Sequence, residues 1–299
     1  MMLFDPAVAM QPLLDVVHQA RTELRIQAET LPSSLHPALR QASQRGVRVR
    51  YLLGPQAAYT LDAQGQPMLP KRPFEQGPQG ADIDFAGATG DLLINPNFSE
   101  LGPKGQFRPG VRSHAFYLTA GDSAALCTGS PVLKVRPLCV TGDAPVARAL
   151  AALFDSEFLD TLGGAERAAL AAQARRVIVV GPDDNAPLLE LLSVPGAVVL
   201  TSGLDQGKAF TQLTRGDRKT LVIPVGISRL PAVEAARRAG VKVVTREGGF
   251  EGTVVWTPGR AFMGSQRLTD AALERDRDVG VILQGEGADA LRKFIEGRS

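Results

Sequence analysis

A chain of 299 residues, 44% of them hydrophobic, is long enough to bury one large core or two cores of about 150 residues each. Its 33 Lys and Arg against 31 Asp and Glu give a formal net charge of +2, so the chain as a whole is not built to attract a polyanion, and any phosphate site must be local. The N-terminus shows no basic segment followed by an apolar one, and no apolar run approaches about 18 residues. We therefore expect a cytoplasmic protein without a membrane span.

The first half of the chain opens with helix and strand signals in alternation. Residues 8–22 have apolar side chains at helical spacing, and the alternating segment 24–28 predicts a strand. A second helix ends at Gly46, where alternating valines begin another strand. Residues 54–112 are crowded with Gly, Pro and Gln, which predicts an inserted loop with at most short strands near 83–85 and 92–94.

Two cysteines and a second alternating pattern follow. Cys127 and Cys139 lie in short apolar runs without CxxC spacing, so we predict two buried thiols with no redox or metal role. After an Ala-rich connector at 154–176, strands are predicted at Val177, Ala197, Lys219 and Val241, with helices near Leu188, Lys208 and Val233. Such alternation predicts a largely parallel sheet.

The chain also contains an internal repeat. Residues 37–50 match residues 231–244 without a gap, and each segment is a helix, a glycine and a strand. A second match pairs the strand and helix from Arg136 with those from Arg277. Between the paired segments, Thr128-Gly129-Ser130 matches Met263-Gly264-Ser265. The repeat predicts two lobes, residues 1–165 and 166–299.

This order of segments resembles the phospholipase D superfamily, whose two lobes each carry the motif H-x-K-x4-D-x6-G-S. Counted back from Gly129-Ser130, Asp122 falls at the Asp position and His114 one position early, while the Lys position holds Phe116 or Tyr117. The resemblance implies an α/β fold of duplicated lobes, each a mixed sheet flanked by helices. It further implies that the lobes are related by a pseudo-twofold axis, with the two Gly-Ser segments meeting at the centre.

The second motif keeps less of the family pattern. Counted back from Gly264-Ser265, the His, Lys and Asp positions hold Phe250, Gly252 and Thr257. The stretch GSQRLT is similar to the family's GSxNLT, with Arg267 in place of Asn. The resemblance thus implies phosphate-binding roles for Ser130, Ser265 and Arg267. The two serines alternatively allow close packing at the lobe junction, and Arg267 alternatively is a solvated surface residue.

The family's chemistry needs two histidines, one to attack phosphorus and one to protonate the leaving oxygen, and two lysines to hold phosphate oxygens. Of three histidines here, His18 and His36 fall on predicted helices away from both motifs. His114 is the candidate nucleophile, or alternatively a structural histidine, and Asp122 is a catalytic candidate or a hairpin-turn residue. Loss of the histidine that protonates the leaving oxygen typically lowers the catalytic rate by a factor of about 10²–10⁴. We therefore expect a non-catalytic member of the family, with no cofactor and no metal.

Three functions remain open. The first is binding of nucleic acid or another phosphodiester, helped by cations of the insertion and of the second half: Lys71, Arg72, Lys104, Arg108, Arg215, Arg218, Lys219, Arg237 and Arg238. The second is an active phosphodiesterase or nuclease using His114, which requires another acid and a cation nearby. The third is an assembly protein whose former active-site face became a homodimer interface lined by Phe116, Tyr117 and Phe250. The groups around His114 discriminate among the three.

Overall fold

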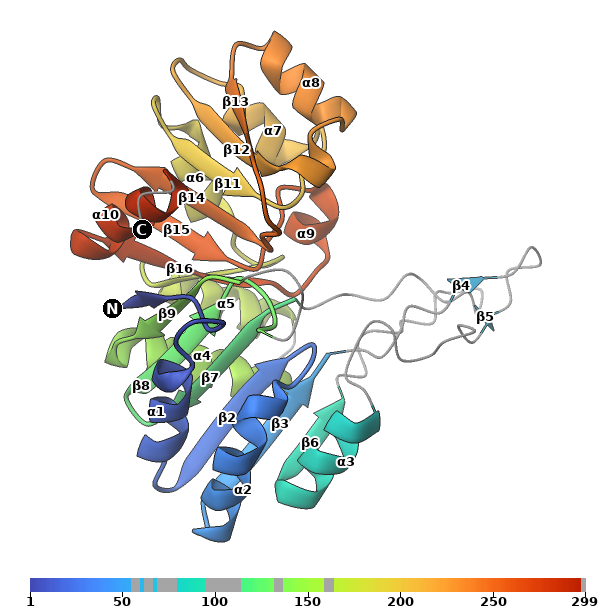
Figure 1. Cartoon of the computed structure of the whole chain (residues 1–299), viewed down its shortest axis with the longest axis vertical. Helices are drawn as coiled ribbons and strands as arrows, with labels where there is room; N and C mark the ends of the chain where they lie inside the picture. The colour runs from blue at the N-terminus through green and yellow to red at the C-terminus, as the bar shows by residue number, and fades with distance from the viewer. Residues whose placement is uncertain are drawn as a thin grey trace.

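The computed structural model describes residues 1–54, 60–61, 67–68, 80–94, 114–131, 137–158 and 164–296. The chain forms two α/β lobes stacked along the long axis of the molecule, the first coloured blue to green and the second yellow to red (Figure 1). Each lobe is built on a seven-stranded sheet. None of the described helices is long and apolar enough to cross a membrane.

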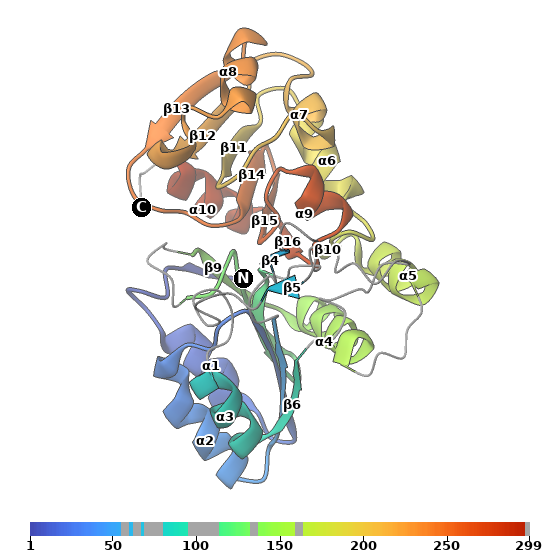
Figure 2. The same ribbon diagram turned by 90° about the vertical axis from the view of Figure 1, so that its right-hand side faces the viewer.

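The first lobe has the strand order β1-β9-β8-β7-β2-β3-β6. Helices α1, α2 and α3 cover one face of this sheet and α4 lies on the other (Figure 2). Leu13 of α1 and Leu39 of α2 pack with Ile26 of β2 in the core between helices and sheet. The elements, in chain order, are β1 (Leu3–Phe4), α1 (Gln11–Gln19), β2 (Glu23–Ala28), η1 (Ser33–Leu35), α2 (His36–Gln44), β3 (Arg48–Leu53), β4 (Thr60–Leu61), β5 (Pro67–Met68), α3 (Gly80–Thr89), β6 (Asp91–Ile94), β7 (Phe116–Ala120), β8 (Ser123–Cys127), β9 (Cys139–Gly142) and α4 (Ala144–Phe158).

The second lobe repeats this architecture with the order β10-β16-β15-β14-β11-β12-β13. Strands β11, β12 and β13 are parallel, whereas β14, β15, β16 and β10 pair antiparallel, so the sheet is mixed. The elements are α5 (Gly164–Ala174), β10 (Ile178–Val180), α6 (Ala186–Ser193), β11 (Val198–Thr201), α7 (Lys208–Leu213), β12 (Thr220–Pro224), η3 (Val225–Ile227), α8 (Pro231–Arg238), β13 (Lys242–Arg246), β14 (Thr253–Thr257), β15 (Arg260–Gly264), α9 (Asp270–Glu274), β16 (Val279–Gln284) and α10 (Glu286–Ile295).

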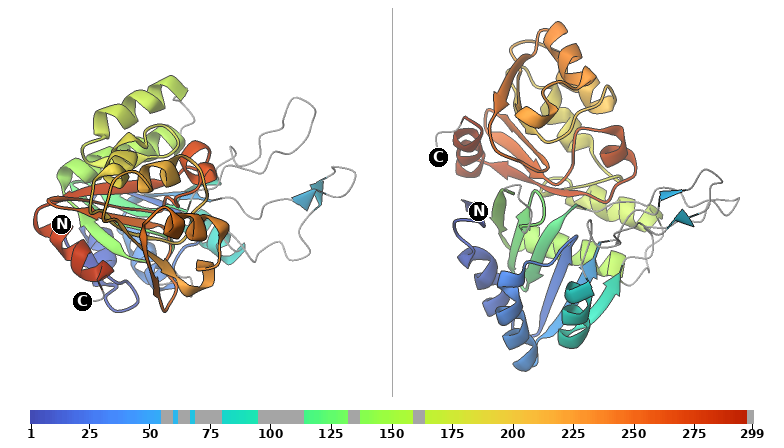
Figure 3. Two further views of the ribbon diagram at one scale, coloured as in Figure 1. Left: turned by 90° about the horizontal axis from the view of Figure 1, so that it is seen from above. Right: turned by 45° about the vertical axis from the view of Figure 1, so that its right-hand side comes forward.

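The two strand orders match position by position, which confirms the predicted duplication of α/β lobes. The second lobe lies directly above the first in the right-hand view of Figure 3. One apolar cluster runs through the junction between them, with Tyr117 and Leu126 from the first lobe and Val254 and Val281 from the second. Burial of a shared core joins the lobes into one packed unit.

The structure corrects the way in which the repeat aligns. The match of 37–50 with 231–244 pairs α2–β3 with α8–β13, but in the sheet orders β3 corresponds to β12 and β13 corresponds to β6. The match therefore pairs the helix–strand unit that ends in β3 with the unit that follows its true counterpart β12 in the second lobe. Every helix–strand unit of such a lobe has an apolar helix stripe, a terminal glycine and alternating valines, so a local match cannot distinguish one unit from the next.

The range 54–112, predicted as an insertion, contains helix α3 and strand β6. Strand β6 pairs parallel with β3, from Arg50↔Asp91 to Leu53↔Ile94, and so extends the first sheet. The predicted strand at 83–85 is part of α3. The predicted lobe boundary at 165/166 falls within α5 and stays a prediction.

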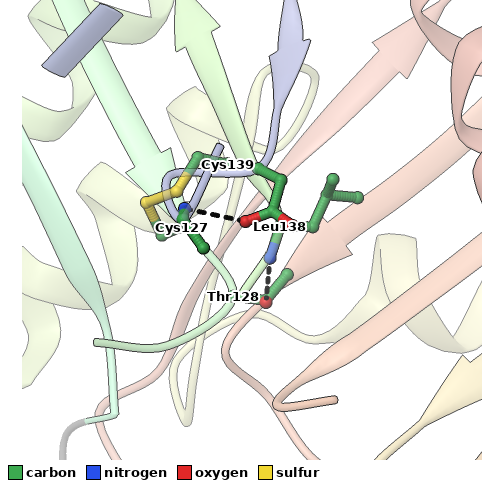
Figure 4. Close-up of a disulfide and its surroundings, with 6 residues drawn as sticks. Cys127, Thr128, Leu138 and Cys139 are labelled. Atoms are coloured by element: carbon green, nitrogen blue, oxygen red, sulfur yellow. Dashed lines mark hydrogen bonds between the residues drawn. A yellow bond between two sulfur atoms is a disulfide. The ribbon is translucent and has the colours of Figure 1, made fainter. Parts of the chain in front are cut away.

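The two cysteines form a disulfide, so the prediction of free thiols is wrong. Cys127 and Cys139 are register partners in β8 and β9, with Cα atoms 4.0 Å apart (Figure 4). Beside the disulfide, Thr128 N–H donates to the carbonyl oxygen of Leu138 at 2.9 Å, and Leu138 N–H donates to Thr128 Oγ1 at 3.1 Å. The sequence located both strands, but only their pairing shows that the two cysteines face each other.

Candidate functional site

Two hairpins of equal length lie at the centre of the molecule. Strands β7 and β8 pair Phe116 with Cys127, and strands β14 and β15 pair Thr253 with Gly264, each through five-residue strands. After each hairpin the same hydrogen bonds recur. Ser265 N–H donates to the carbonyl oxygen of Val279 at 3.0 Å, and Val279 N–H donates to Ser265 Oγ at 3.1 Å, as Thr128 and Leu138 do in the first lobe.

These contacts place Thr128, and not Ser130, at the position of Ser265. The predicted match of Gly129-Ser130 with Gly264-Ser265 is therefore shifted by two residues. The match of small residues took no account of the register that the hairpins impose. In the corrected alignment, Ser130 corresponds to Arg267.

The same alignment gives His114 a counterpart that the sequence reading missed. His114 lies two residues before β7, and Glu251 lies two residues before β14. Counting a fixed spacing back from Gly264-Ser265 had pointed to Phe250 instead. Aligning the two hairpin turns, Gly121-Asp122 and Pro258-Gly259, was the sequence signal that could have identified Glu251.

His114 is buried against an acidic residue of the other lobe. Its Nδ1 lies 3.4 Å from Oδ1 of Asp278, and its backbone N–H donates to the same oxygen at 3.2 Å. Asp278 is fully buried and also accepts a hydrogen bond from Ser265 Oγ at 2.9 Å. The first lobe thus supplies an imidazole and the second lobe its carboxylate partner.

The environment of His114 has opposing effects on its pKa. Burial lowers the pKa, whereas the negative charges of Asp278 and Glu29 raise it, and the net result is a raised pKa. A carboxylate facing Nδ1 favours the tautomer with the proton on Nδ1. The lone pair of a neutral His114 then resides on Nε2.

Glu251 approaches the junction from the second lobe. Its Oε1 lies 3.2 Å from Nη2 of Arg267, while a Cβ built on Gly129 of the first lobe would lie only 2.5 Å from its Oε2. Burial raises the pKa of Glu251 in spite of the opposing charge of Arg267. Among the described residues, neither Glu251 Oε2 nor Arg267 Nε has a hydrogen-bond partner, although both atoms are buried.

Comparison with solved structures identifies the architecture. Phosphatidylserine synthase from Haemophilus influenzae Rd KW20 superposes with a TM-score of 0.63 at 12% identity, over 99% of this chain and 85% of that one. Polyphosphate kinase from Porphyromonas gingivalis superposes with a TM-score of 0.58 at 14% identity, over 99% of this chain and 49% of that one. The chain has a phospholipase D-like fold. No family model and no curated protein sequence matches it.

In this phospholipase D-like fold, the two predicted phosphate-binding serines donate their hydroxyl hydrogens to other groups of the chain. Ser130 Oγ donates to the carbonyl oxygen of Thr30 at 2.7 Å, and Ser265 Oγ donates to Asp278. Both side chains are buried. Their contacts hold β-strand ends in place, and a phosphate-binding role for either serine stays a prediction.

Asp122 does not lie with His114. It occupies the turn between β7 and β8, at the opposite end of β7, and its exposed carboxylate pairs with exposed Arg148 at 3.1 Å. Gly121 has φ +57°, a backbone conformation that glycine adopts readily in a tight turn. Aspartate is likewise a common turn residue, which accounts for Asp122 at this position. The structure therefore supports the turn alternative and not a catalytic one.

Two of the described cations predicted to bind nucleic acid lie away from the lobe junction. Lys71, Arg72, Lys104 and Arg108 lie outside the described residues. Arg237 and Arg238 belong to α8 at the outer end of the second lobe (Figure 1), where Arg237 pairs with Glu234.

Lys219 is unsuited to nucleic-acid contact, because its side chain is buried. Its Nζ donates to the carbonyl oxygens of Leu192 and Gln212 at 2.7 and 2.6 Å, and burial lowers its pKa to about 8. This lysine therefore caps the C-terminal ends of α6 and α7. The prediction that it contacts nucleic acid is wrong.

One further group of side chains has the composition of a metal site. His114, Asp276 and Asp278 each offer a ligand atom, all within 4.8 Å of one another. Hydrogen bonds already engage these carboxylates, because Asp276 Oδ1 accepts from Arg275 Nε at 3.2 Å and Asp278 Oδ1 accepts from Ser265 and His114. We assign no metal to them.

The residues predicted to line a homodimer interface are buried within the chain. Phe116 is fully buried in the core of the first lobe and Tyr117 in the apolar cluster at the lobe junction, while Phe250 is 7% exposed and its ring is tilted against that of Phe294. They do not form an exposed apolar face. Dimerisation stays a prediction without support from these residues.

Proposed function

We propose that the chain hydrolyses a phosphodiester at the lobe junction, with His114 as the nucleophile. The observation that supports it most is the approach of Asp278 Oδ1 to His114 Nδ1 at 3.4 Å across the two lobes. A carboxylate in this position orients an imidazole and leaves Nε2 free to attack phosphorus. The two similar structures are named for enzymes of phosphorus compounds, phosphatidylserine synthase and polyphosphate kinase.

Arg267 supplies the cation that the proposal requires. The positions of the family's two lysines, two residues after His114 and Glu251, hold Phe116 and Thr253, which are buried and uncharged. Arg267 Nε lies buried at the junction without a hydrogen-bond partner among the described residues. A guanidinium donates to phosphate oxygens and keeps its charge at any working pH.

The proposal is tested with bis(4-nitrophenyl) phosphate as substrate, in the presence of EDTA. We expect slow turnover by the intact protein, and a loss of at least about 100-fold in His114→Asn, since removing the nucleophile removes the covalent route. His18→Asn, at an exposed position of α1, is the matched control and should keep full activity. Equal rates for the intact protein and His114→Asn would refute the proposal.

A second candidate function is binding of nucleic acid or another phosphodiester without turnover. It is supported by the loss of both lysines and by Arg267, whose positive charge acts on both His114 and Glu251. Loss of charge stabilisation reduces turnover more than it reduces binding.

Titration of single- and double-stranded DNA at several salt concentrations tests this second candidate. If DNA lies at the junction, Arg267→Ala should weaken binding and reduce its salt dependence, because one phosphate contact is lost. Arg148→Ala, an exposed arginine paired with Asp122, should leave both unchanged. Absence of binding at low salt would contradict this function.

A further inference from the structure

We infer that Glu251 is the catalytic acid–base partner of His114, a carboxyl group standing where a symmetric site would hold a second imidazole. The inference rests on the proposed function and adds the second catalytic residue to it.

The backbone places the two residues equivalently. Each lies two residues before a five-residue strand, and the two hairpins share register and the hydrogen bonds that follow them. Related backbone positions in a pseudo-twofold arrangement direct their side chains toward the axis in the same way. His114 accordingly reaches Asp278 of the second lobe, and Glu251 reaches Gly129 of the first.

The partners of the two residues differ in a way that fits different roles. Asp278, which precedes Val279, faces His114, whereas the equivalent position before Leu138 holds Pro137 and offers no carboxylate to Glu251. Arg267 pairs with Glu251, while its counterpart Ser130 carries no charge. An acceptor at Nδ1 holds an imidazole in the tautomer whose Nε2 is the nucleophile, whereas a carboxyl group gives up a proton without such a partner.

One oxygen of Glu251 is available for a proton transfer. Arg267 engages Oε1, while Oε2 is buried and has no hydrogen-bond partner among the described residues. Burial raises the pKa of Glu251, so its carboxyl group keeps a proton to higher pH than an exposed glutamate does. Both features are those of a general acid.

The proposed reaction has two balanced steps. His114 Nε2 attacks phosphorus and forms an N–P bond, while the P–O bond to the leaving group breaks and Glu251 Oε2 gives its proton to the departing oxygen. The Glu251 carboxylate then takes a proton from water as the water oxygen attacks phosphorus and the N–P bond breaks. The net change converts a diester and water into a monoester and an alcohol, and restores both residues.

The test compares the intact protein with Glu251→Gln on two probes that differ in leaving group. With bis(4-nitrophenyl) phosphate, whose leaving group departs without a proton, Glu251→Gln should release a first equivalent of nitrophenolate at nearly the normal rate and then stall. With dithymidine phosphate, whose alkoxide needs a proton, the variant should be slower by about 10²–10⁴-fold. Mass spectrometry of the stalled variant should show an acid-labile adduct on His114.

Controls separate this inference from the proposed function. Glu247→Gln removes an exposed carboxylate four residues away and should behave like the intact protein. If the intact protein turns over and His114→Asn does not, while Glu251→Gln shows neither stalling nor leaving-group dependence, only the role of Glu251 is overturned. If the intact protein gives no turnover with either probe, the proposed function fails and the role of Glu251 with it.

Discussion

Asp278, in the second lobe, raises the pKa of His114 in the first lobe. It is fully buried, and Ser265 Oγ and the backbone N–H of His114 both hold its Oδ1 in place. A buried carboxylate so fixed stabilises the charged form of the neighbouring imidazole, which raises the pKa of His114 above its ordinary value of 6.5. The pair therefore contributes stability below pH 6.5 that is lost as the pH rises through the folded-state pKa.

Asp278→Asn should move the titration of His114 to lower pH, because the lowering of its pKa by burial is then opposed only by the weaker effect of Glu29. Turnover needs neutral His114, so the acid limb of the pH–rate profile should move to lower pH as well. Its maximum should fall by about 10²–10⁴-fold, since an amide does not hold the imidazole in the required tautomer. NMR titration of the three histidine rings measures the pKa directly, with His114→Asn identifying the signal.

Asp276→Asn is the control for this prediction. Asp276 pairs with Arg275 and is not the carboxylate that faces Nδ1 at 3.4 Å, so the variant should leave most of the pKa shift of His114 in place. A titration of His114 unchanged by Asp278→Asn would show that the pair has no electrostatic role.

The residues of the site differ in how far the sequence reveals them. His114 and Arg267 were identified because family motifs locate them. Asp278 was missed, since no local motif distinguishes it from other acidic residues, and its role depends on a contact with His114, 164 positions away in the sequence. Glu251 was missed because its equivalence to His114 depends on the alignment of the two hairpins. Charges that meet across lobes become visible only when the lobes are placed together.

Single elements were more predictable than their correspondence. The strands near Val177, Ala197, Lys219 and Val241 are β10 to β13, and the helices near Leu188, Lys208 and Val233 are α6 to α8, because periodicity and terminal glycines are local signals. The match from Arg136 and Arg277 is confirmed as β9–α4 and β16–α10.

The errors at this scale have one physical origin. Pairing between strands decides which units are equivalent, which cysteines face each other and which part of 54–112 joins a sheet. Local sequence similarity carries little information about such long-range pairing. The hairpins β7–β8 and β14–β15 align reliably because a two-residue turn fixes the register of both strands.

The two lobes approach each other so closely at Gly252 that this position has no room for a side chain. Gly252 has φ +82°, and a Cβ there would overlap the carbonyl oxygen of Gly264 and lie 2.7 Å from that of Thr128 in the first lobe. These obstacles are backbone atoms, which cannot rotate away as a side chain can. A side chain at this position therefore forces the lobes apart.

Gly252→Ala should destabilise the protein by at least about 3 kcal/mol, from the unfavourable φ together with the clash across the lobes. Gly259→Ala provides a matched control in the turn of the same hairpin, because Gly259 has φ +79° and no atom within 4 Å of an added Cβ. It should lose only the stability that an unfavourable φ costs, about 1–2 kcal/mol.

Urea unfolding of both variants measures the difference in the free energy of unfolding. Because the lobes separate in Gly252→Ala, this variant alone should also lose His114-dependent turnover. Equal midpoints for the two variants would mean that the lobes accommodate a methyl group at the junction, contrary to the close contact of Gly252 with both of them.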